Sequence, residues 1–202
     1  MILLILAIPI LSFIALMFWM SHLCAKQMTL YRIKKGKHYS TRFNDVIKLP
    51  YKLGLVTKDR LEFNVMFSDG TSPDNWYEDR STHKLYGMAF GFDLHYRSIR
   101  LGWQTMGGEM VKLYAYNYLD GKRYWTELCT IHCYENYRIL MYRESDEMYE
   151  IRVYQGEGKT DLIGGTVVPM EKKYDGLRFK LFPYYGGKLT APNEVRIYIK
   201  EI

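Results

Sequence analysis

The fold of this chain is decided by the stretch Leu113-Tyr-Ala-Tyr-Asn-Tyr-Leu-Asp-Gly-Lys-Arg-Tyr-Trp-Thr-Glu-Leu128. Two segments that alternate in side-chain type flank Asp120-Gly121, a pair that suits a two-residue type I′ turn. Such a turn sets the register of both strands, so that Leu119 pairs with Lys122, Tyr118 with Arg123, Asn117 with Tyr124, Tyr116 with Trp125 and Tyr114 with Glu127. The stretch therefore predicts an antiparallel β-hairpin.

This hairpin has two unlike faces, because successive side chains of a strand point to opposite sides. One face collects aromatic and charged side chains, namely Tyr114, Tyr116, Tyr118, Arg123, Trp125 and Glu127. The other face carries the side chains that we expect in the core, namely Val111, Leu113, Ala115, Tyr124, Thr126 and Leu128. The aromatic and charged face is then expected to be exposed or to line a groove.

The same two-residue period recurs along the chain. In residues 60–67, Leu61, Phe63 and Val65 share one side, and similar alternation occurs in residues 136–142, 148–154, 177–182 and 195–199. Turn-forming pairs such as Gly164-Gly165 and Asp175-Gly176 separate these segments. About ten short strands at this spacing predict an all-β protein, an antiparallel β-sandwich of the jelly-roll type.

Residues 1–25 contain no Asp, Glu, Lys or Arg. Twenty apolar residues make a helix of roughly 30 Å, which matches the hydrocarbon core of a bilayer. We therefore predict a single transmembrane anchor, with Trp19 at the interface. A cleaved signal peptide and a lipid-modified Cys24 are the alternatives. Neither pattern is clear, since no basic residue precedes the run and Ser21-His22-Leu23 stands where small residues are expected.

Positive charge is concentrated after this anchor. Residues 26–60 carry a net charge of +8, whereas the remainder of the charged residues sum to −2. We assign residues 26–37 as a basic juxtamembrane segment that contacts membrane lipid, and residues 38–202 as one domain. The basic flank favours a cytoplasmic domain, whereas the predicted fold is commoner outside cells, so the side of the membrane stays open. No nucleic-acid-binding pattern occurs, and we expect no nucleic-acid partner.

Several stretches resemble uncharacterised bacterial membrane-associated β-sandwich proteins. They are His83-Lys-Leu-Tyr-Gly87, Arg100-Leu-Gly-Trp103, the hairpin at Asp120-Gly121, and Leu181-Phe-Pro-Tyr-Tyr-Gly-Gly187 with Ala191-Pro-Asn193. The order of elements is similar to that of concanavalin A-like lectin and glucanase jelly rolls. That resemblance implies a sandwich whose concave sheet binds carbohydrate, and it says more about fold than about function.

Two hypotheses of function follow. The first is a non-catalytic carbohydrate-binding module, because sugars stack on Tyr and Trp rings and bind neighbouring Arg and Glu. Its candidate ligand-binding residues are Tyr114, Tyr116, Tyr118, Arg123, Trp125 and Glu127, with the loops around Trp76 and Trp103 as further contacts. The second is a scaffold that contacts another envelope protein, with the same aromatic side chains packed within the sheet or at the interface.

Enzyme and metal sites are weakly indicated. A retaining glycosidase needs two carboxylates about 5 to 5.5 Å apart, but Glu144 and Asp146 suit a polar turn and Glu150 falls too far along. A polysaccharide lyase would need a base such as His95 or Tyr96 near Arg97 and Arg100. Cys129, His132 and Cys133 on one strand suit free thiols better than a metal site. Residues 68–75 offer oxygen ligands for calcium without the EF-hand spacing, so no cofactor is predicted.

Overall fold

A computed structural model describes residues 28–42, 53–56, 58–68, 81–107, 109–170, 176–187 and 189–202. In this part of the chain, thirteen β-strands form two antiparallel sheets, and no α-helix is present. None of these residues therefore forms a helix long and apolar enough to cross a membrane. The anchor predicted at residues 1–25 lies outside the described residues.

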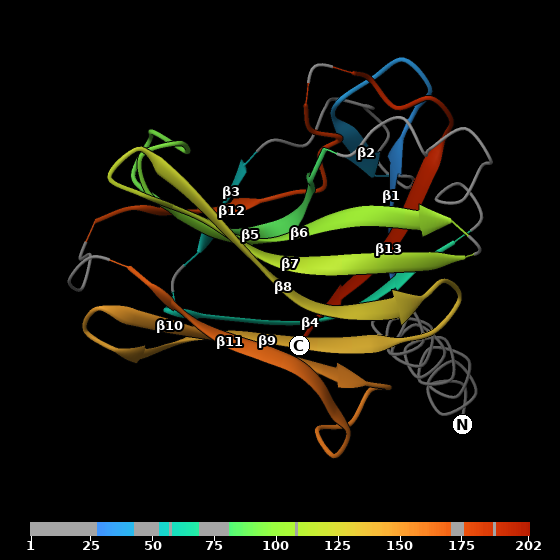
Figure 1. Cartoon of the computed structure of the whole chain (residues 1–202). Helices are drawn as coiled ribbons and strands as arrows, with labels where there is room; N and C mark the ends of the chain where they lie inside the picture. Colours follow the sequence, from blue (N-terminus) through green and yellow to red (C-terminus); the bar gives the residue numbers. More distant parts are fainter. Residues whose placement is uncertain are drawn as a thin grey trace, which may run out of the picture.

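The two sheets lie face to face, with β5 to β8 over β4 and β9 to β11 (Figure 1). The seven-stranded sheet has the order β11 (Leu162–Pro169), β10 (Met148–Gln155), β9 (Tyr137–Ser145), β4 (Arg60–Phe67), β13 (Val195–Glu201), β1 (Thr29–Ile33) and β2 (Ser40–Arg42). The six-stranded sheet has the order β3 (Leu53–Val56), β12 (Arg178–Leu181), β5 (His83–Phe90), β6 (Ser98–Gly107), β7 (Met110–Leu119) and β8 (Lys122–His132). The prediction of an antiparallel β-sandwich is confirmed.

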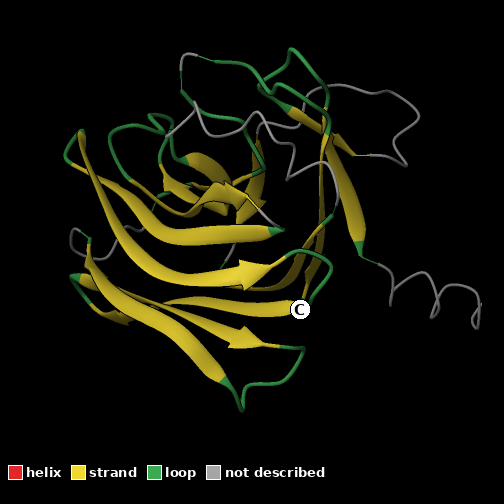
Figure 2. Ribbon diagram, turned by 45° about the vertical axis from the view of Figure 1, so that its right-hand side comes forward, coloured by secondary structure: helices red, strands yellow, loops and turns green. Residues whose placement is uncertain are grey.

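The two sheets contain local meanders and are linked by several crossings of the chain. Strands β5 to β8 follow one another as a meander, and so do β9 to β11. The chain crosses between the sheets from β2 to β3, β3 to β4, β4 to β5, β8 to β9, β11 to β12 and β12 to β13. Figure 2 shows the same two layers of strands, joined by loops at their ends. The finer assignment to a concanavalin A-like jelly roll stays a prediction.

The core fills the space between the sheets, as the alternation predicts. Leu61, Phe63 and Val65 are all buried, and Phe63 packs edge-on against Tyr86 with 4.8 Å between ring centroids. Each large apolar side chain buried in this way contributes about 1.5–3 kcal/mol relative to exposure. The five ranges predicted from alternation correspond to β4, β9, β10, β12 and β13.

The β7–β8 hairpin has the predicted register at every pair, from Leu119↔Lys122 to Tyr114↔Glu127. Asp120 and Gly121 have φ angles of 52° and 73°, as a type I′ turn requires. One part of the prediction is wrong, because Tyr124 and Thr126 are exposed and Leu128 is only half-buried. The reason is that β8 is the last strand of its sheet and carries a bulge opposite Leu113 and Tyr114, so its inner face is only partly covered.

Candidate functional site

A hollow of about 330 Å³ lies on the outer face of the six-stranded sheet. The residues that line it are Ser81, Thr82, Lys84, Tyr116, Tyr118, Arg123, Trp125 and Gly187. Four of the six predicted ligand-binding residues are therefore brought together. Of the other four lining residues, Ser81 and Thr82 lead into β5, Lys84 lies in β5, and Gly187 lies in the loop after β12. No local pattern in the sequence links those segments to the hairpin.

The register of the sheet explains this grouping. Tyr116 pairs with Trp125 and Tyr118 pairs with Arg123, so these four side chains emerge side by side on one face. Lys84 lies opposite Gly102 on β6. A Cβ atom at Gly102 would lie 2.6 Å from the methyl carbon of Thr82, so the glycine allows Thr82 to lie against the sheet as a wall.

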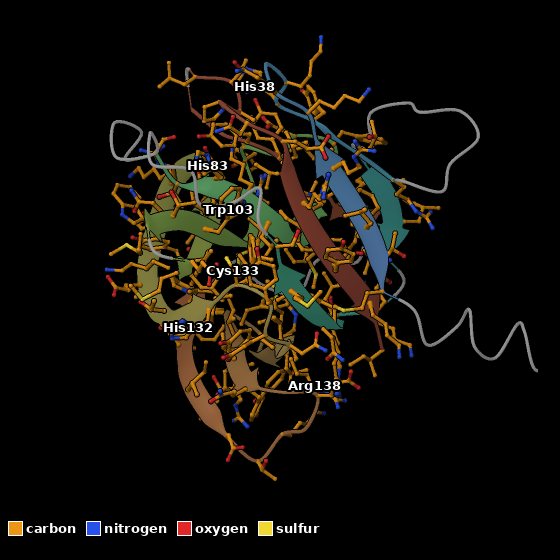
Figure 3. All side chains as sticks on the ribbon, turned by 90° about the vertical axis from the view of Figure 1, so that its right-hand side faces the viewer. His38, His83, Trp103, His132, Cys133 and Arg138 are labelled. Atoms are coloured by element: carbon orange, nitrogen blue, oxygen red, sulfur yellow. The ribbon has the colours of Figure 1, made fainter. Side chains whose placement is uncertain are left out.

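One rim of the hollow is held in place by buried aromatic packing. The backbone N–H of Gly186 donates to Nδ1 of His83 at 3.2 Å, and the His83 ring stacks on Tyr185 with centroids 3.7 Å apart. His83 also lies 4.6 Å from the Trp103 ring, and the two are neighbours in Figure 3. His83 thus forms a hydrogen bond with a residue 103 positions away in the sequence, and it positions the Gly186–Gly187 segment.

The predicted contacts of ligand with the loops around Trp76 and Trp103 have different outcomes. Trp103 lies in β6 and is fully buried in the core, so that part of the prediction is wrong. Its side chain points between the sheets because His83↔Trp103 and Trp103↔Leu113 are inward-facing pairs. Trp76 lies outside the described residues.

The loop of residues 91–97 flanks the aromatic and charged face of the β7–β8 hairpin, near its turn. The backbone N–H of Gly121 donates to the carbonyl oxygen of Tyr96 at 3.1 Å. The His95 ring contacts Tyr118 edge-on with centroids 5.1 Å apart. Burial, together with repulsion from Lys84 and Arg100, lowers the pKa of His95, which keeps its imidazole neutral at pH 7.

The aromatic side chains of the hollow differ in exposure. Tyr116 is only 3% exposed, whereas Trp125 is 54% exposed. The Arg123 guanidinium lies over the Trp125 ring at 4.8 Å from its centroid. The hydroxyl oxygens of Tyr116 and Tyr118 are 3.4 Å apart. The hollow therefore offers one flat, accessible ring beside hydroxyl, ammonium and guanidinium groups.

Positive charge gathers around Tyr116. Nζ of Lys84 and Cζ of Arg100 lie 5.8 and 5.9 Å from its ring centroid. Arg100 is 6% exposed, and its Nη2 donates to the carbonyl oxygen of Leu94 and to Oγ of Ser98. Burial and repulsion from Arg100 and Arg123 lower the pKa of Lys84 to about 8. Burial lowers the pKa of Arg100 to about 10, so Arg100 stays charged at pH 7.

Two predicted site residues do not line the hollow. The Tyr114 hydroxyl donates to Oε1 of Gln104 at 3.0 Å, and Glu127 accepts from Nζ of Lys112 at 3.0 Å. They lie on the same face, one row farther from the turn, next to the bulge of β8. The six predicted ligand-binding residues are thus divided between the hollow and a neighbouring row of hydrogen-bonded polar side chains.

The carboxylates weighed for a glycosidase lie elsewhere. Glu144 and Asp146 are exposed at the β9–β10 hairpin, where Asp146 and Glu147 form the turn. Glu150 accepts hydrogen bonds from Tyr142 and from Nε of Arg152, the latter at 2.6 Å. Glu150 thus makes structural contacts on the seven-stranded sheet, whereas Glu144 and Asp146 lie on its exposed hairpin.

Metal ligands are not grouped in the described part of the chain, where no three His, Cys, Asp or Glu residues are placed to hold an ion. Cys129 is a free thiol there and Cys133 is buried, and burial raises the pKa of Cys129 to about 12. Except for Ser68, the segment weighed for calcium lies outside the described residues.

Comparison with known proteins does not assign a family. No family model matches the chain, and no curated protein matches its sequence. Solved structures match at low similarity. The "CBM2 module of Lactobacillus casei BL23 phage J-1 evolved Dit" is 9% identical with a TM-score of 0.37, over 83% of this chain and 80% of that one.

Two further structures match to a similar extent. A protein of unknown function from Shewanella oneidensis MR-1 is 9% identical with a TM-score of 0.42, over 86% of this chain and 70% of that one. Scytalido-glutamic peptidase is 10% identical with a TM-score of 0.33, over 87% of this chain and 65% of that one. At these TM-scores the likenesses support no functional argument. Any proposal of function therefore depends on the chain's own residues.

Proposed function

We propose that this protein is a non-catalytic binding module that takes carbohydrate into the hollow on its six-stranded sheet. The observation that carries the proposal is the half-exposed Trp125 ring at a hollow that polar side chains line. Leaving such a ring in water forgoes about 1.5–3 kcal/mol of burial, which is typical of a ring kept for a ligand. Sugars match this setting, since they offer flat C–H faces for stacking and hydroxyl groups for hydrogen bonds.

Two further observations, on the fold and on the N-terminal residues, extend the proposal. The concanavalin A-like resemblance implies carbohydrate on one sheet of a sandwich, and the hollow lies on the outer face of such a sheet. The uncharged residues 1–25 support an anchor that holds the domain beside a membrane. Residues 29–33 form β1 of the sandwich, so the basic side chains of this segment that suit lipid headgroups are the exposed Lys34, Lys35 and Lys37. We propose a single-pass protein on this basis.

The test uses the full chain in a polyoxyethylene detergent, whose headgroup contains no sugar. Binding to a glycan array is followed by calorimetry with the oligosaccharides that bind. Trp125→Ala is expected to weaken binding at least tenfold, about 1.4 kcal/mol, because the stacking surface is lost. Tyr124→Ala is the matched control, since Tyr124 is its neighbour on β8, is 43% exposed and points to the opposite face.

The outcomes are distinct. If no glycan binds the folded protein, or if Tyr124→Ala and Trp125→Ala weaken binding equally, the proposal is wrong. Chromatography of each bound oligosaccharide after incubation separates binding from cleavage. Shortened products would replace the binding module with a glycoside hydrolase or a polysaccharide lyase, with the neutral His95 beside Tyr118 as the first base to substitute.

One observation favours the second candidate, a scaffold that contacts another envelope protein. The edge strand β11 exposes Leu162, Ile163 and Val167, with Leu162 the most exposed of the three. Apolar side chains on an edge strand suit a partner that adds a strand to the sheet. In pull-downs from the native membrane, Val167→Lys is expected to release such a partner, whereas Trp125→Ala is not. The opposite pattern would contradict the scaffold.

A further inference from the structure

Resting on the proposed function, we infer that the hollow selects acidic carbohydrate, with the anionic group of a sugar residue bound between Lys84 and Arg123 and supported by Arg100. The shared chemistry is a carboxylate or sulfate carried on a sugar ring. The inference goes beyond carbohydrate binding, because a neutral sugar would need only the aromatic ring and hydrogen-bonding groups of the hollow.

Among the described residues, the three cations have no acidic partner. In the part of the chain that the structure describes, none of Lys84, Arg100 and Arg123 forms an ion pair with a carboxylate. Their contacts are with aromatic rings and, for Arg100, with neutral oxygen atoms of Leu94 and Ser98. Lys112 on the same sheet provides the contrast, since it is paired with Glu127.

This arrangement works against folding. Gathering like charges in a partly buried site costs free energy, and the lowered pKa of Lys84 reflects both its burial and repulsion from Arg100 and Arg123. The cost is relieved when an anion enters the hollow, so the cluster has a reason to persist if the ligand is acidic. Sites at which folding rules are broken in this way are typical of function.

Arg100 adds a second, independent observation. It is 6% exposed, and its Nε has no hydrogen-bond acceptor among the described residues. Buried guanidinium groups are normally fully hydrogen-bonded, because an unsatisfied polar group loses its hydration without compensation. Arg100 thus keeps donor capacity behind the Tyr116 ring, on the side of the sheet where the hollow lies.

Ring and charge are also placed together. The Arg123 guanidinium lies 4.8 Å from the centroid of Trp125, so a sugar that stacks on the exposed indole meets a cation at its edge. The charged and titratable groups around Lys84 are Arg100, Arg123, Tyr116, Tyr118, Tyr184 and His95, and Asp93 acts on His95. Positive charge dominates this surface.

The test measures acidic oligosaccharides that contain uronate, sialate or sulfate, each against a neutral counterpart made by carboxyl reduction or desulfation. Full-length protein is used in the same sugar-free detergent. We expect acidic probes to bind at least tenfold more tightly than their neutral counterparts. Arg123→Gln and Lys84→Gln should each remove at least five-fold of that preference.

Matched controls remove the same charge from the same sheet. Lys122→Gln changes the neighbour of Arg123 on β8, which points to the opposite face, and Lys112→Gln changes a lysine that is already paired. Both controls should keep the preference for acidic probes. A second readout is proton uptake on binding near pH 8 to 9, measured by calorimetry in buffers of different ionisation enthalpy, because a bound anion should raise the pKa of Lys84.

Each outcome is decisive. Equal binding of acidic and neutral probes would overturn this inference and leave carbohydrate binding intact. Equal losses in Arg123→Gln and Lys122→Gln would overturn it as well, since the effect would then be general attraction. Failure of every glycan to bind would overturn the proposed function itself. Preference for uronate and sialate over sulfate, or the reverse, identifies which anionic group the hollow takes.

Discussion

Two clusters of positive charge, one on the outer face of each sheet, differ in whether their cations are paired with a carboxylate. On the seven-stranded sheet, Glu62 accepts from Arg60, Arg138 and Lys159, with 2.8 Å to Nζ of Lys159. Figure 3 shows Arg138 far from the His83–Trp103 pair. On the six-stranded sheet, Lys84, Arg100 and Arg123 surround aromatic rings and pair with no described carboxylate.

The comparison distinguishes cations that are paired within the fold, around Glu62, from cations that are available to a ligand, at the hollow. Burial alone would raise the pKa of Glu62, but hydrogen bonds from Lys159, Arg60 and Arg138 outweigh it and lower that pKa to about 2. For Lys84 no opposing charge outweighs burial, and the pKa falls to about 8. The Glu62 cluster therefore gains stability from its charges, whereas the three cations at the hollow cost stability and stay available to an external anion.

The largest effect on the free energy of unfolding is expected for Glu62 and its three cations. Glu62→Gln should lower the free energy of unfolding at pH 7 by about 2 kcal/mol, because three cations lose their shared partner. The folded pKa lies below the ordinary value of 4.5, so this stabilisation is present above pH 4.5 and is lost as the pH falls toward 2. Urea unfolding at pH 7 and pH 3 measures it.

The control for Glu62→Gln is Glu147→Gln, at an exposed turn position of the β9–β10 hairpin. This control should leave stability almost unchanged at both pH values. Equal effects of the two substitutions would show that the Glu62 network contributes nothing particular to the fold.

A second prediction compares two turns with the same backbone strain. Gly121 and Gly156 have φ angles of 73° and 74°, with no atom closer than 3.9 Å to an added Cβ at either position. Replacing either with Ala should cost about 1–2 kcal/mol, because a left-handed backbone disfavours a side chain. Thermal unfolding should show similar losses, and only Gly121→Ala, whose turn leads into Arg123 and Trp125, should also weaken ligand binding.

Removing one of the unpaired cations at the hollow is expected to stabilise the protein. Lys84→Met should raise the free energy of unfolding at pH 7 by about 1 kcal/mol, a figure reduced for the partial exposure of the site. The charged lysine costs most below its folded pKa of about 8, and the cost disappears as the pH rises to 10.5, the ordinary value. The advantage of the variant should therefore vanish over that window in urea unfolding.

Lys112→Met provides the contrast for that measurement. Its hydrogen bond to Glu127 raises the pKa of Lys112, so this variant should gain no stability at pH 7. If Lys84→Met were instead destabilising at pH 7, the idea that cations on this face oppose folding would be wrong.

The smallest effect on stability is expected at Trp125. Trp125→Ala should change the free energy of unfolding by less than about 0.5 kcal/mol, since the ring is largely exposed. A loss of more than about 1 kcal/mol in urea unfolding would indicate that the Tyr116–Trp125 pair serves mainly to stabilise the sheet. The aromatic side chains would then be structural, as the alternative interpretation of the sequence holds.

Much of the sandwich could be predicted because its strands carry a local signal. The alternation in residues 60–67 matches β4, and Asp120-Gly121 predicted each pair of the hairpin from Leu119↔Lys122 to Tyr114↔Glu127. A two-residue turn leaves little freedom in register, so local sequence was sufficient there. Tyr124 was predicted in the core but is exposed, because β8 is an edge strand. The position of β8 depends on the order of strands in the sheet, which the hairpin sequence does not specify.

The site was predicted in part for the same reason. Tyr116, Tyr118, Arg123 and Trp125 share one hairpin, so the register placed them together. Lys84, Thr82 and Gly187 are distant in the sequence and reach the hollow only because β5 lies two strands from β7 and the Gly186 segment is bonded to His83. Their roles could not be read from spacing.

The sequence by itself determined the strand pattern, the hairpin register and the grouping of aromatic side chains with Arg123, because these depend on near neighbours and on the alternation of side chains along a strand. It also determined the uncharged character of residues 1–25. Only the tertiary structure decided that Lys84 and Arg100 lie 5.8 and 5.9 Å from the centroid of the Tyr116 ring and that neither pairs with a carboxylate of the described residues. Electrostatic energies depend on distance and burial in space, and the packing of strands far apart in the chain sets both.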